Sequence, residues 1–447
     1  TDEQGKIAAQ PDEQQVLQAA QTLIDRGARG LVVSFANSEK NPANERWVRQ
    51  MIKREYPRDY LGSVSVFLSS DISPRSGLAE RLNSAILNAY IHPKLARLLY
   101  KAGEDLRQRH YRNTLFIGHN NASVARVAKT RAINTYNSGP AAGLLGASEI
   151  GRLYGIENLI STDMGGTSFD IGYVRNGQAS YALQPNVEGF PCNLPMMSIL
   201  ALGTGGGSIA HLDNGELKVG PQSAGALPGP ACFNLGGTEP TVTDANLVLG
   251  VLDPDFFLGG SMKLDVAKAQ EVIKREIADP MGLSVPEAAW QIKSVVDKQM
   301  GGAVEKVAAN LPEDADPVVV AYGGAGGLHA CDIASASPVR KIIMTPFSAV
   351  SSAFSSSLLD VGHLYYQRID QPLALDMDCT RLQQAVDGMM QEAVRDMRGE
   401  GFAAEVLSSE LQLFIEPQAG GGEQLMPGTG EFYQRIERLK QSTAQDG

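Results

Sequence analysis

Residues 159–170 read Leu159-Ile160-Ser161-Thr162-Asp163-Met164-Gly165-Gly166-Thr167-Ser168-Phe169-Asp170. The apolar start of this stretch predicts a buried strand, and the strand leads directly into two glycines. Glycines let the backbone turn tightly and approach an anion, because no Cβ stands in the way. Successive amides of such a turn, and the hydroxyls of Thr167 and Ser168, can donate hydrogen bonds to phosphate oxygens. Residues 165–168 are therefore predicted to hold a phosphate group at a strand end.

Asp163 and Asp170 stand on either side of this turn. A carboxylate in that place can hold Mg²⁺ through water, as magnesium prefers, so both aspartates are predicted to be catalytic and metal-binding residues. The alternative is a glycine-rich β-hairpin, because a second possible strand follows a turn at Asn176 and Gly177. The two interpretations are compatible, since the first turn of a hairpin can also bind a phosphate.

A second glycine cluster lies at the end of another apolar run, which begins at Val318. Its predicted nucleotide-binding residues are Gly323, Gly324, Gly326 and Gly327. A strand that ends in glycines and enters a helix places the helix N-terminus against an anion or a nucleotide. A Rossmann dinucleotide site is rejected, because the spacing is GGxGG and Arg340-Lys341 precedes the next strand.

A third cluster, residues 203–208, contributes Gly205 and Gly206 to the predicted cofactor site. It is followed by turn-rich sequence at 221–230 and 236–246. Long ordered loops in compact proteins are usually functional, so this region is expected to be a structured loop system. The alternative is an ordinary surface loop without a function.

Helices and strands alternate along the first third of the chain. Helices are expected over residues 15–26, 44–56, 78–90 and 93–109, and strands over 31–35, 64–68 and 114–118. This alternation predicts an α/β fold with a mostly parallel sheet covered on both faces. Three segments are expected, namely an α/β lobe at 1–136, a nucleotide-binding lobe with an inserted loop region at 137–370, and a C-terminal helix and strand extension at 371–447.

Composition excludes several classes of protein. The formal net charge of −11 argues against a duplex nucleic acid or an anionic membrane as partner. The four cysteines form no CxxC pair, which argues against a disulfide framework or a cysteine zinc site and favours a reducing cytoplasm. His119, His211 and His329 show no HxH or HExxH spacing, so hydrogen-bonded structural roles are the simpler interpretation.

Six segments in fixed order, 41–46, 138–143, 163–170, 221–246, 252–260 and 323–330, resemble the hydantoinase A/oxoprolinase family. The resemblance covers about residues 16–360. It implies a two-lobed nucleotide-binding fold of the sugar-kinase and actin type. Residues 163–170 look like the second phosphate motif of that fold, and residues 323–327 look like its adenosine motif. Residues 138–143 and 346–362 look like the connecting helices between the lobes.

Members of this family begin with a strand that carries a first phosphate motif similar to Asp-x-Gly-Gly-Thr. This sequence shows no such segment before Asn41. The resemblance therefore implies that Thr1 corresponds to a point inside a typical member. Productive turnover is expected to require that N-terminal segment, because both phosphate loops close over the nucleotide.

The resemblance implies one of two ATP- and Mg²⁺-dependent reactions. Acetone and acetophenone carboxylases, which are ligases, phosphorylate a ketone enol and bicarbonate before joining them, whereas hydantoinases and oxoprolinases open a cyclic amide. Phe169 resembles the carboxylase subunits, so the first expectation is an ATP-binding subunit of a cytoplasmic ketone carboxylase. It would act on a ketone and bicarbonate in a hetero-oligomer with other carboxylase subunits. A non-catalytic scaffold subunit with a degenerate nucleotide site is the third interpretation.

Overall fold

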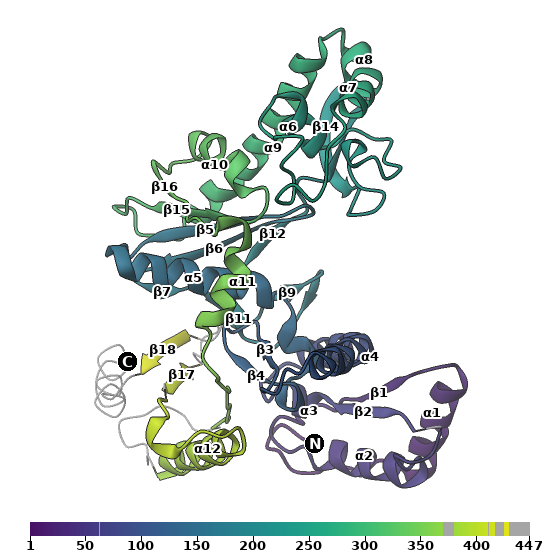
Figure 1. Ribbon diagram of the computed structural model, residues 1–447. Helices are drawn as coiled ribbons and strands as arrows, with labels where there is room; N and C mark the ends of the chain where they lie inside the picture. Colours follow the sequence, from purple (N-terminus) through teal and green to yellow (C-terminus); the bar gives the residue numbers. More distant parts are fainter. Residues whose placement is uncertain (62, 370–379, 410, 416–423, 429–447) are drawn as a thin grey trace. The chain divides into compact units, whose positions relative to one another are not determined.

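The computed structural model describes residues 1–61, 63–369, 380–409, 411–415 and 424–428. The chain divides into two compact units, one formed by Thr1–Ala85 with His363–Gly447 and the other by Ile86–Gly362. Figure 1 shows the labelled elements of each unit. The three segments expected from composition remain a prediction, and their boundary at 370/371 lies outside the described residues.

A mixed sheet forms the centre of the second unit, and it confirms the predicted α/β class. Its strand order is β12-β6-β5-β15-β16, with β7 beside β6. The strands β5, β15 and β16 are parallel, whereas β6 runs antiparallel to β5, β7 and β12. The bounds are Leu159–Met164 for β5, Phe169–Arg175 for β6, Gln178–Ala179 for β7, Leu200–Leu202 for β12, Val318–Tyr322 for β15 and Lys341–Ile343 for β16.

Helices cover both faces of this sheet (Figure 1). On one face, α5 (Ser138–Tyr154) packs against Leu159, Val174 and Val320. On the opposite face, α9 (Val285–Ala308) and α10 (Gly326–Ser335) pack over the alternate strand residues, such as Ile160 and Val319. Because side chains alternate between the faces of a strand, each buried strand contributes to both cores.

Small residues bring α5 close to the sheet and to α11 (Ser351–Ser355). A Cβ at Gly172 on β6 would lie 2.9 Å from Leu144 Cδ2, and one at Gly143 would lie 2.5 Å from Tyr322 Oη. A Cβ at Gly146 would overlap the side chain of Ser355 on α11. The glycines at 143 and 146 therefore permit the close helix packing that the resemblance implies for connecting helices.

The turn-rich region forms a structured loop, as expected. The hairpin of β13 (Ser208–Asp213) and β14 (Glu216–Ser223) leads into it, and α6 (Val242–Val248) ends it. Buried Asp244 accepts hydrogen bonds from the amides of Ala231, Cys232 and Thr241, and from the Thr241 hydroxyl at 2.8 Å. One carboxylate thus ties the middle of the loop to its end at α6. The helices α7 (Val266–Ile273) and α8 (Asp279–Met281) follow.

The strands of the first third do not form one mostly parallel sheet. The strands β1 (Gly30–Val33) and β2 (Ser65–Leu68) pair in parallel in the first unit. In the second unit, β3 (Phe116–Gly118) pairs antiparallel with β4 (Val124–Arg126), a strand that the sequence reading missed. The physical reason is the short connection, because a few residues allow a hairpin whereas a parallel pair needs a long crossover.

The first unit also contains α1 (Glu13–Asp25), α2 (Ala43–Glu55), α3 (Ser69–Ile72), α12 (Thr380–Gly399) and the strands β17 (Leu411–Ile415) and β18 (Gln424–Gly428). The two helices expected over 78–90 and 93–109 are a single helix, α4 (Leu78–Gln108), with Pro93 inside it. Good helix formers follow the proline, and they continue the helix despite the missing amide donor. Residues 371–379, 410, 416–423 and 429–447 of the expected C-terminal extension lie outside the described residues.

Candidate functional site

The predicted phosphate turn joins β5 to β6. Asp163 and Asp170 are direct cross-strand partners in this antiparallel pair, so both carboxylates leave the same face of the sheet. The Gly165 amide closes the turn by donating to the Ser168 carbonyl at 3.1 Å. A Cβ at Gly165 or Gly166 would meet nothing within 4 Å, so the turn is open to a ligand. Both the hairpin interpretation and the open first turn are therefore present in one structure.

Burial shapes the acidity of the two aspartates. It raises the pKa of Asp163, and a 2.7 Å hydrogen bond from Ser352 Oγ partly opposes this. It also raises the pKa of Asp170; a hydrogen bond from Ser168 Oγ opposes the rise, and the charge of Asp163 adds to it. Two neighbouring, partly buried carboxylates are a favourable place for a cation.

The donor set fits Mg²⁺ better than a metal held entirely by protein. Within the described parts of the chain, no group of three or more His, Cys, Asp or Glu side chains could hold a metal ion. Magnesium is commonly bound by one or two carboxylates, with water and substrate phosphates completing its six positions. Asp163 and Asp170 at the phosphate turn offer that arrangement.

The second glycine cluster contacts the end of β5, directly before the 165–168 turn. Gly323 has φ +90°, and a Cβ there would overlap the Asp163 carboxylate and the Met164 carbonyl. The Ala325 amide donates to the Met164 carbonyl at 2.9 Å. Because β5 and β15 are parallel neighbours, their carboxyl ends bring both clusters to one edge of the sheet, the usual place for ligands in α/β folds.

The glycines of the 323–327 loop have different surroundings. Gly324 is exposed and a Cβ there would meet nothing within 4 Å, so its backbone is accessible. Gly326 is buried at the first turn of α10. A Cβ at Gly327 would lie 2.8 Å from the methyl group of Met344. Within this loop, Gly324 is therefore the glycine whose backbone is most open to a ligand.

The third cluster, residues 203–208, packs against the 165–168 turn and donates hydrogen bonds to its backbone. Gly205 and Gly206 are buried. The Gly206 amide donates to the Gly165 carbonyl at 3.0 Å, and the Gly207 amide donates to the Gly166 carbonyl at 2.7 Å. A Cβ at Gly205 would lie 2.7 Å from the Thr167 amide nitrogen. A cofactor-binding role for Gly205 and Gly206 remains a prediction. Their contacts are with the backbone of the 165–168 turn.

Sequence reasoning missed two residues that complete this arrangement. Ser352 on α11 donates to Asp163, and Thr243 on α6 donates its hydroxyl to the Gly206 carbonyl at 2.7 Å. The only available signal was the small-residue segment 346–362 for the first residue and the turn-rich segment 236–246 for the second. Phe169 is 1 % exposed and lies in the hydrophobic core, so it does not face a ligand bound at the turn.

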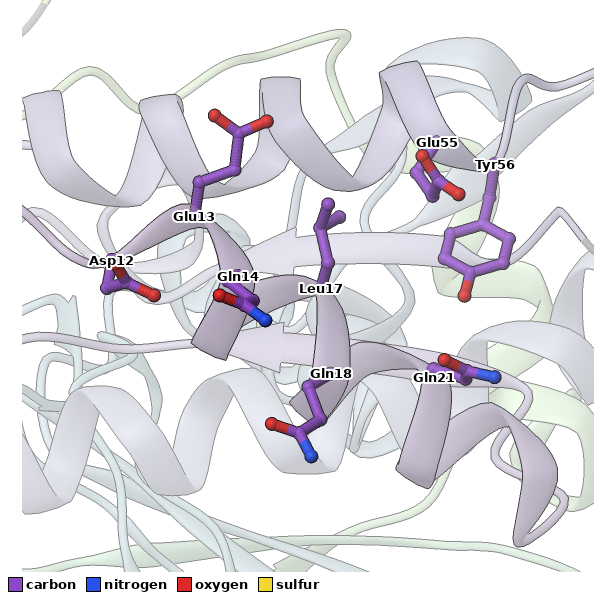
Figure 2. A pocket seen from close by; sticks show the side chains of 8 residues that line it. All are labelled: Asp12, Glu13, Gln14, Leu17, Gln18, Gln21, Glu55 and Tyr56. Atoms are coloured by element: carbon purple, nitrogen blue, oxygen red, sulfur yellow. The ribbon is translucent and has the colours of Figure 1, made fainter.

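A groove of about 670 Å³ lies elsewhere, at α1 and α2 of the first unit. Figure 2 shows its lining side chains, which are mostly acidic and amide groups, from Asp12 at the start of α1 to Tyr56 after α2. None of the predicted site residues lines it.

Among the histidines, His119 lies 3.1 Å from the Thr130 hydroxyl, which agrees with a structural role.

The family model for hydantoinase/oxoprolinase proteins matches residues 81–364, which include all three glycine clusters. The chain belongs to the hydantoinase/oxoprolinase family. This confirms the resemblance that the six ordered segments indicated. Within the described residues of this family member, no helix is long and apolar enough to cross a lipid bilayer.

Relatives within the hydantoinase/oxoprolinase family include subunits of different enzymes. The acetophenone carboxylase gamma subunit of Aromatoleum aromaticum is 37 % identical over 424 residues, covering 92 % of this chain and 57 % of the relative. The caprolactamase subunit alpha of Pseudomonas jessenii is 32 % identical over 401 residues, covering 88 % and 57 %. The chain thus spans a little over half the length of these relatives.

The fold is similar to a solved structure of acetone carboxylase in its nucleotide-free form. The TM-score is 0.80 at 26 % sequence identity, and the match covers 97 % of this chain and 63 % of the acetone carboxylase chain. The α/β architecture described above is therefore shared with an enzyme of ATP-dependent acetone carboxylation.

Proposed function

We propose that this chain binds ATP with Mg²⁺ and forms part of a ketone carboxylase that phosphorylates a ketone enol, bicarbonate or both before the carbon–carbon bond is made. The observation that carries the proposal is the contact between the 323–327 loop and the end of β5, beside the first glycine cluster. The 323–327 loop reaches the Asp163 carboxylate and the Met164 backbone directly beside the open phosphate turn. The identity of 37 % with an acetophenone carboxylase subunit supports the choice of reaction.

In this proposal, each group at the 165–168 turn has a separate role in binding the nucleotide. Asp163 and Asp170 would hold Mg²⁺, which when bound neutralises phosphate charge. The amides of Gly166 and Thr167 make no hydrogen bond within the described residues, so they would be available to donate to a phosphate oxygen. Ser352 keeps the Asp163 carboxylate oriented. Catalysis of phosphoryl transfer depends mainly on such positioning and on electrostatic stabilisation, and these groups supply both.

Partner subunits are part of the proposal. Both relatives named above are subunits of larger enzymes. The proposed assay therefore uses the intact protein with the subunits that co-purify with it. Phosphate release is measured with ketone plus bicarbonate and, separately, with hydantoin, 5-oxoproline or caprolactam. Turnover that needs both ketone and bicarbonate supports the carboxylase, and turnover with a cyclic amide alone contradicts it.

Opening of a cyclic amide is the second candidate function, and the 32 % identity with a caprolactamase subunit favours it. The chemistry at the nucleotide would be shared, because phosphorylation of an amide oxygen also creates a better electrophile. A non-catalytic scaffold is the third candidate. Calorimetric titration with a non-hydrolysable ATP analogue and Mg²⁺ separates it from the two enzymes, since a scaffold without a nucleotide site produces no binding heat.

Changing Gly324 to Val is expected to weaken nucleotide binding about tenfold with little change in stability. The site for the new side chain is open, so no protein atom has to move, but the side chain would occupy space beside the loop backbone. Calorimetry gives the dissociation constant, and thermal unfolding gives the stability. Unchanged affinity combined with a lower unfolding temperature would show that Gly324 is a packing residue.

The two aspartates should also make the ligand-free protein less stable as the pH rises. Burial raises the pKa of both from the ordinary value of 3.8, so the folded state holds their protons more tightly than the unfolded chain. Their contribution to the free energy of unfolding is fully present below the ordinary pKa of 3.8. It is lost as the pH rises through the raised pKa of the folded state. The double change Asp163→Asn and Asp170→Asn should flatten this decline in unfolding free energy.

Urea unfolding from about pH 4 to pH 7 measures the effect. The matched control is Asp314→Asn, because Asp314 is exposed and precedes the start of β15, the strand end away from the turn. A pH profile that is the same for the double variant and for the control would contradict the assigned environment of the pair.

A further inference from the structure

A chain of buried polar side chains links α6, α9 and α10. His329 on α10 is 0 % exposed. Its Nδ1 lies 2.6 Å from Asp297 Oδ1 on α9, and its Nε2 lies 2.9 Å from Asn246 Nδ2 on α6. A tautomer with its proton on Nδ1 donates to Asp297 and accepts from the Asn246 amide, so both contacts are satisfied.

Lys293 completes the chain on the side of α9. Its ammonium group lies 2.6 Å from Asp297 Oδ2 and 2.5 Å from Asp332 Oδ2. Burial lowers the pKa of Lys293, and the hydrogen bonds to the two carboxylates outweigh that effect, so the pKa lies above its ordinary value. Buried ion pairs of this kind seldom add net stability compared with apolar packing. A role in fixing geometry accounts for the network better than a role in stability.

The helices at the two ends of this network, α6 and α10, each hold one of two loops in place. These loops are the 165–168 turn and the 323–327 loop. On α6, the Thr243 amide and hydroxyl both donate to the Gly206 carbonyl at 2.7 Å, and the Gly206 amide in turn donates to Gly165 in the phosphate turn. On α10, the first helical residue is Gly326, directly after Ala325, whose amide donates to Met164. The contact between His329 and Asn246 therefore connects the supports of both loops.

We propose that His329 is a positioning residue for the nucleotide site. Through Asn246 and Asp297 it fixes α10 relative to α6, and so fixes the 323–327 loop relative to the 165–168 turn. Its full burial means that it acts through these helices and does not touch a ligand. The proposal rests on the proposed nucleotide function for the identity of the ligand, whereas the fixed relation between the loops can be measured without any ligand.

The test replaces Asn246 with Leu, which removes the partner of His329 and keeps a side chain of similar size. Amide hydrogen exchange is measured without nucleotide at Gly207 and Ala325, whose amides hold the two loops to the β5–β6 turn. Both amides are expected to exchange about tenfold faster in the variant, and the dissociation constant for the Mg²⁺ complex of an ATP analogue should rise about tenfold. The KM for ATP should rise more than kcat falls.

Ile292→Val is the matched control, because Ile292 is a fully buried residue of α9 that takes no part in the hydrogen bonds. It should lower the unfolding temperature without changing loop exchange or nucleotide affinity. If Asn246→Leu fails to fold, Asn246→Ala removes the same partner of His329 without adding a larger apolar side chain, and it replaces Asn246→Leu in the comparison with Ile292→Val.

The outcomes separate the two proposals. Faster loop exchange in Asn246→Leu but not in Ile292→Val supports the positioning role. Equal effects of both variants, or unchanged exchange at Gly207 and Ala325, would overturn it. Faster exchange together with a wild-type protein that binds no nucleotide would support the positioning role and overturn the proposed function alone.

Discussion

Replacing Asp163 with Asn is expected to lower ATP-dependent turnover by about 100-fold or more while the protein stays folded. The carboxylate stands at the end of β5, beside the open phosphate turn and against the 323–327 loop. An amide in its place is a poor magnesium ligand and carries no charge. The loss should therefore appear in the chemical step and in the apparent affinity for Mg²⁺.

The stability of Asp163→Asn should not fall together with its turnover. Burial makes the ionised Asp163 unfavourable, so a neutral side chain of the same shape should leave the unfolding temperature unchanged or raise it. An asparagine oxygen can still accept the hydrogen bond from Ser352. This separation of activity from stability is what distinguishes a ligand-binding carboxylate from a structural one.

Steady-state turnover at several Mg²⁺ concentrations and thermal unfolding of the same samples measure both effects. Ser352→Ala is a useful control, because it removes the hydrogen bond to Asp163 and leaves the carboxylate in place. It should reduce turnover much less than Asp163→Asn. Turnover of Asp163→Asn within about threefold of the wild type would rule out the metal-binding role.

The sequence allowed the elements that carry the site to be predicted because their signals are local. An apolar run followed by glycines defines β5 and its turn, and the Asn176-Gly177 pair correctly marks the hairpin from β6 to β7. Both residues of that pair have positive φ, as a two-residue hairpin turn requires. The order of the six segments was sufficient to indicate the family.

What could not be predicted depends on contacts between distant parts of the chain. Ser352 lies 189 residues from Asp163, and nothing in the spacing of either segment shows that they touch. The same limit applies to the glycines. Gly205 and Gly324 stand in similar glycine-rich sequence, yet the first is packed against the phosphate turn and the second faces open space. Only the tertiary fold distinguishes them.

Phe169 illustrates the difference between a family marker and a ligand contact. It is the residue by which the sequence resembles the carboxylase branch, but its side chain is buried in the core formed by α9 and the sheet. Its neighbour Asp170 points to the other face, because successive strand residues alternate. Any influence of Phe169 on the reaction would therefore be indirect, through the packing that holds β6 in place.

Changing Gly323 to Ala is expected to destabilise the second unit by about 3 kcal/mol. Two effects contribute. The backbone at this position has φ +90°, which disfavours any residue with a side chain, and the added methyl group would overlap the Asp163 carboxylate and the Met164 carbonyl. Neither partner can move freely, because Asp163 is held by Ser352 and Met164 accepts a hydrogen bond from Ala325.

Gly324→Ala provides the matched control one residue away. Its methyl group would meet nothing within 4 Å, so its unfolding free energy should stay within about 0.5 kcal/mol of the wild type. Urea unfolding gives both values from the shift of the midpoint at constant slope. Because the methyl group at 323 pushes on Asp163, the folded fraction of that variant should also lose Mg²⁺-dependent turnover. Equal stability of the two variants would show that the 323–327 loop is free to move away from Asp163 and Met164. Its contact with these two residues would then no longer support a shared nucleotide site.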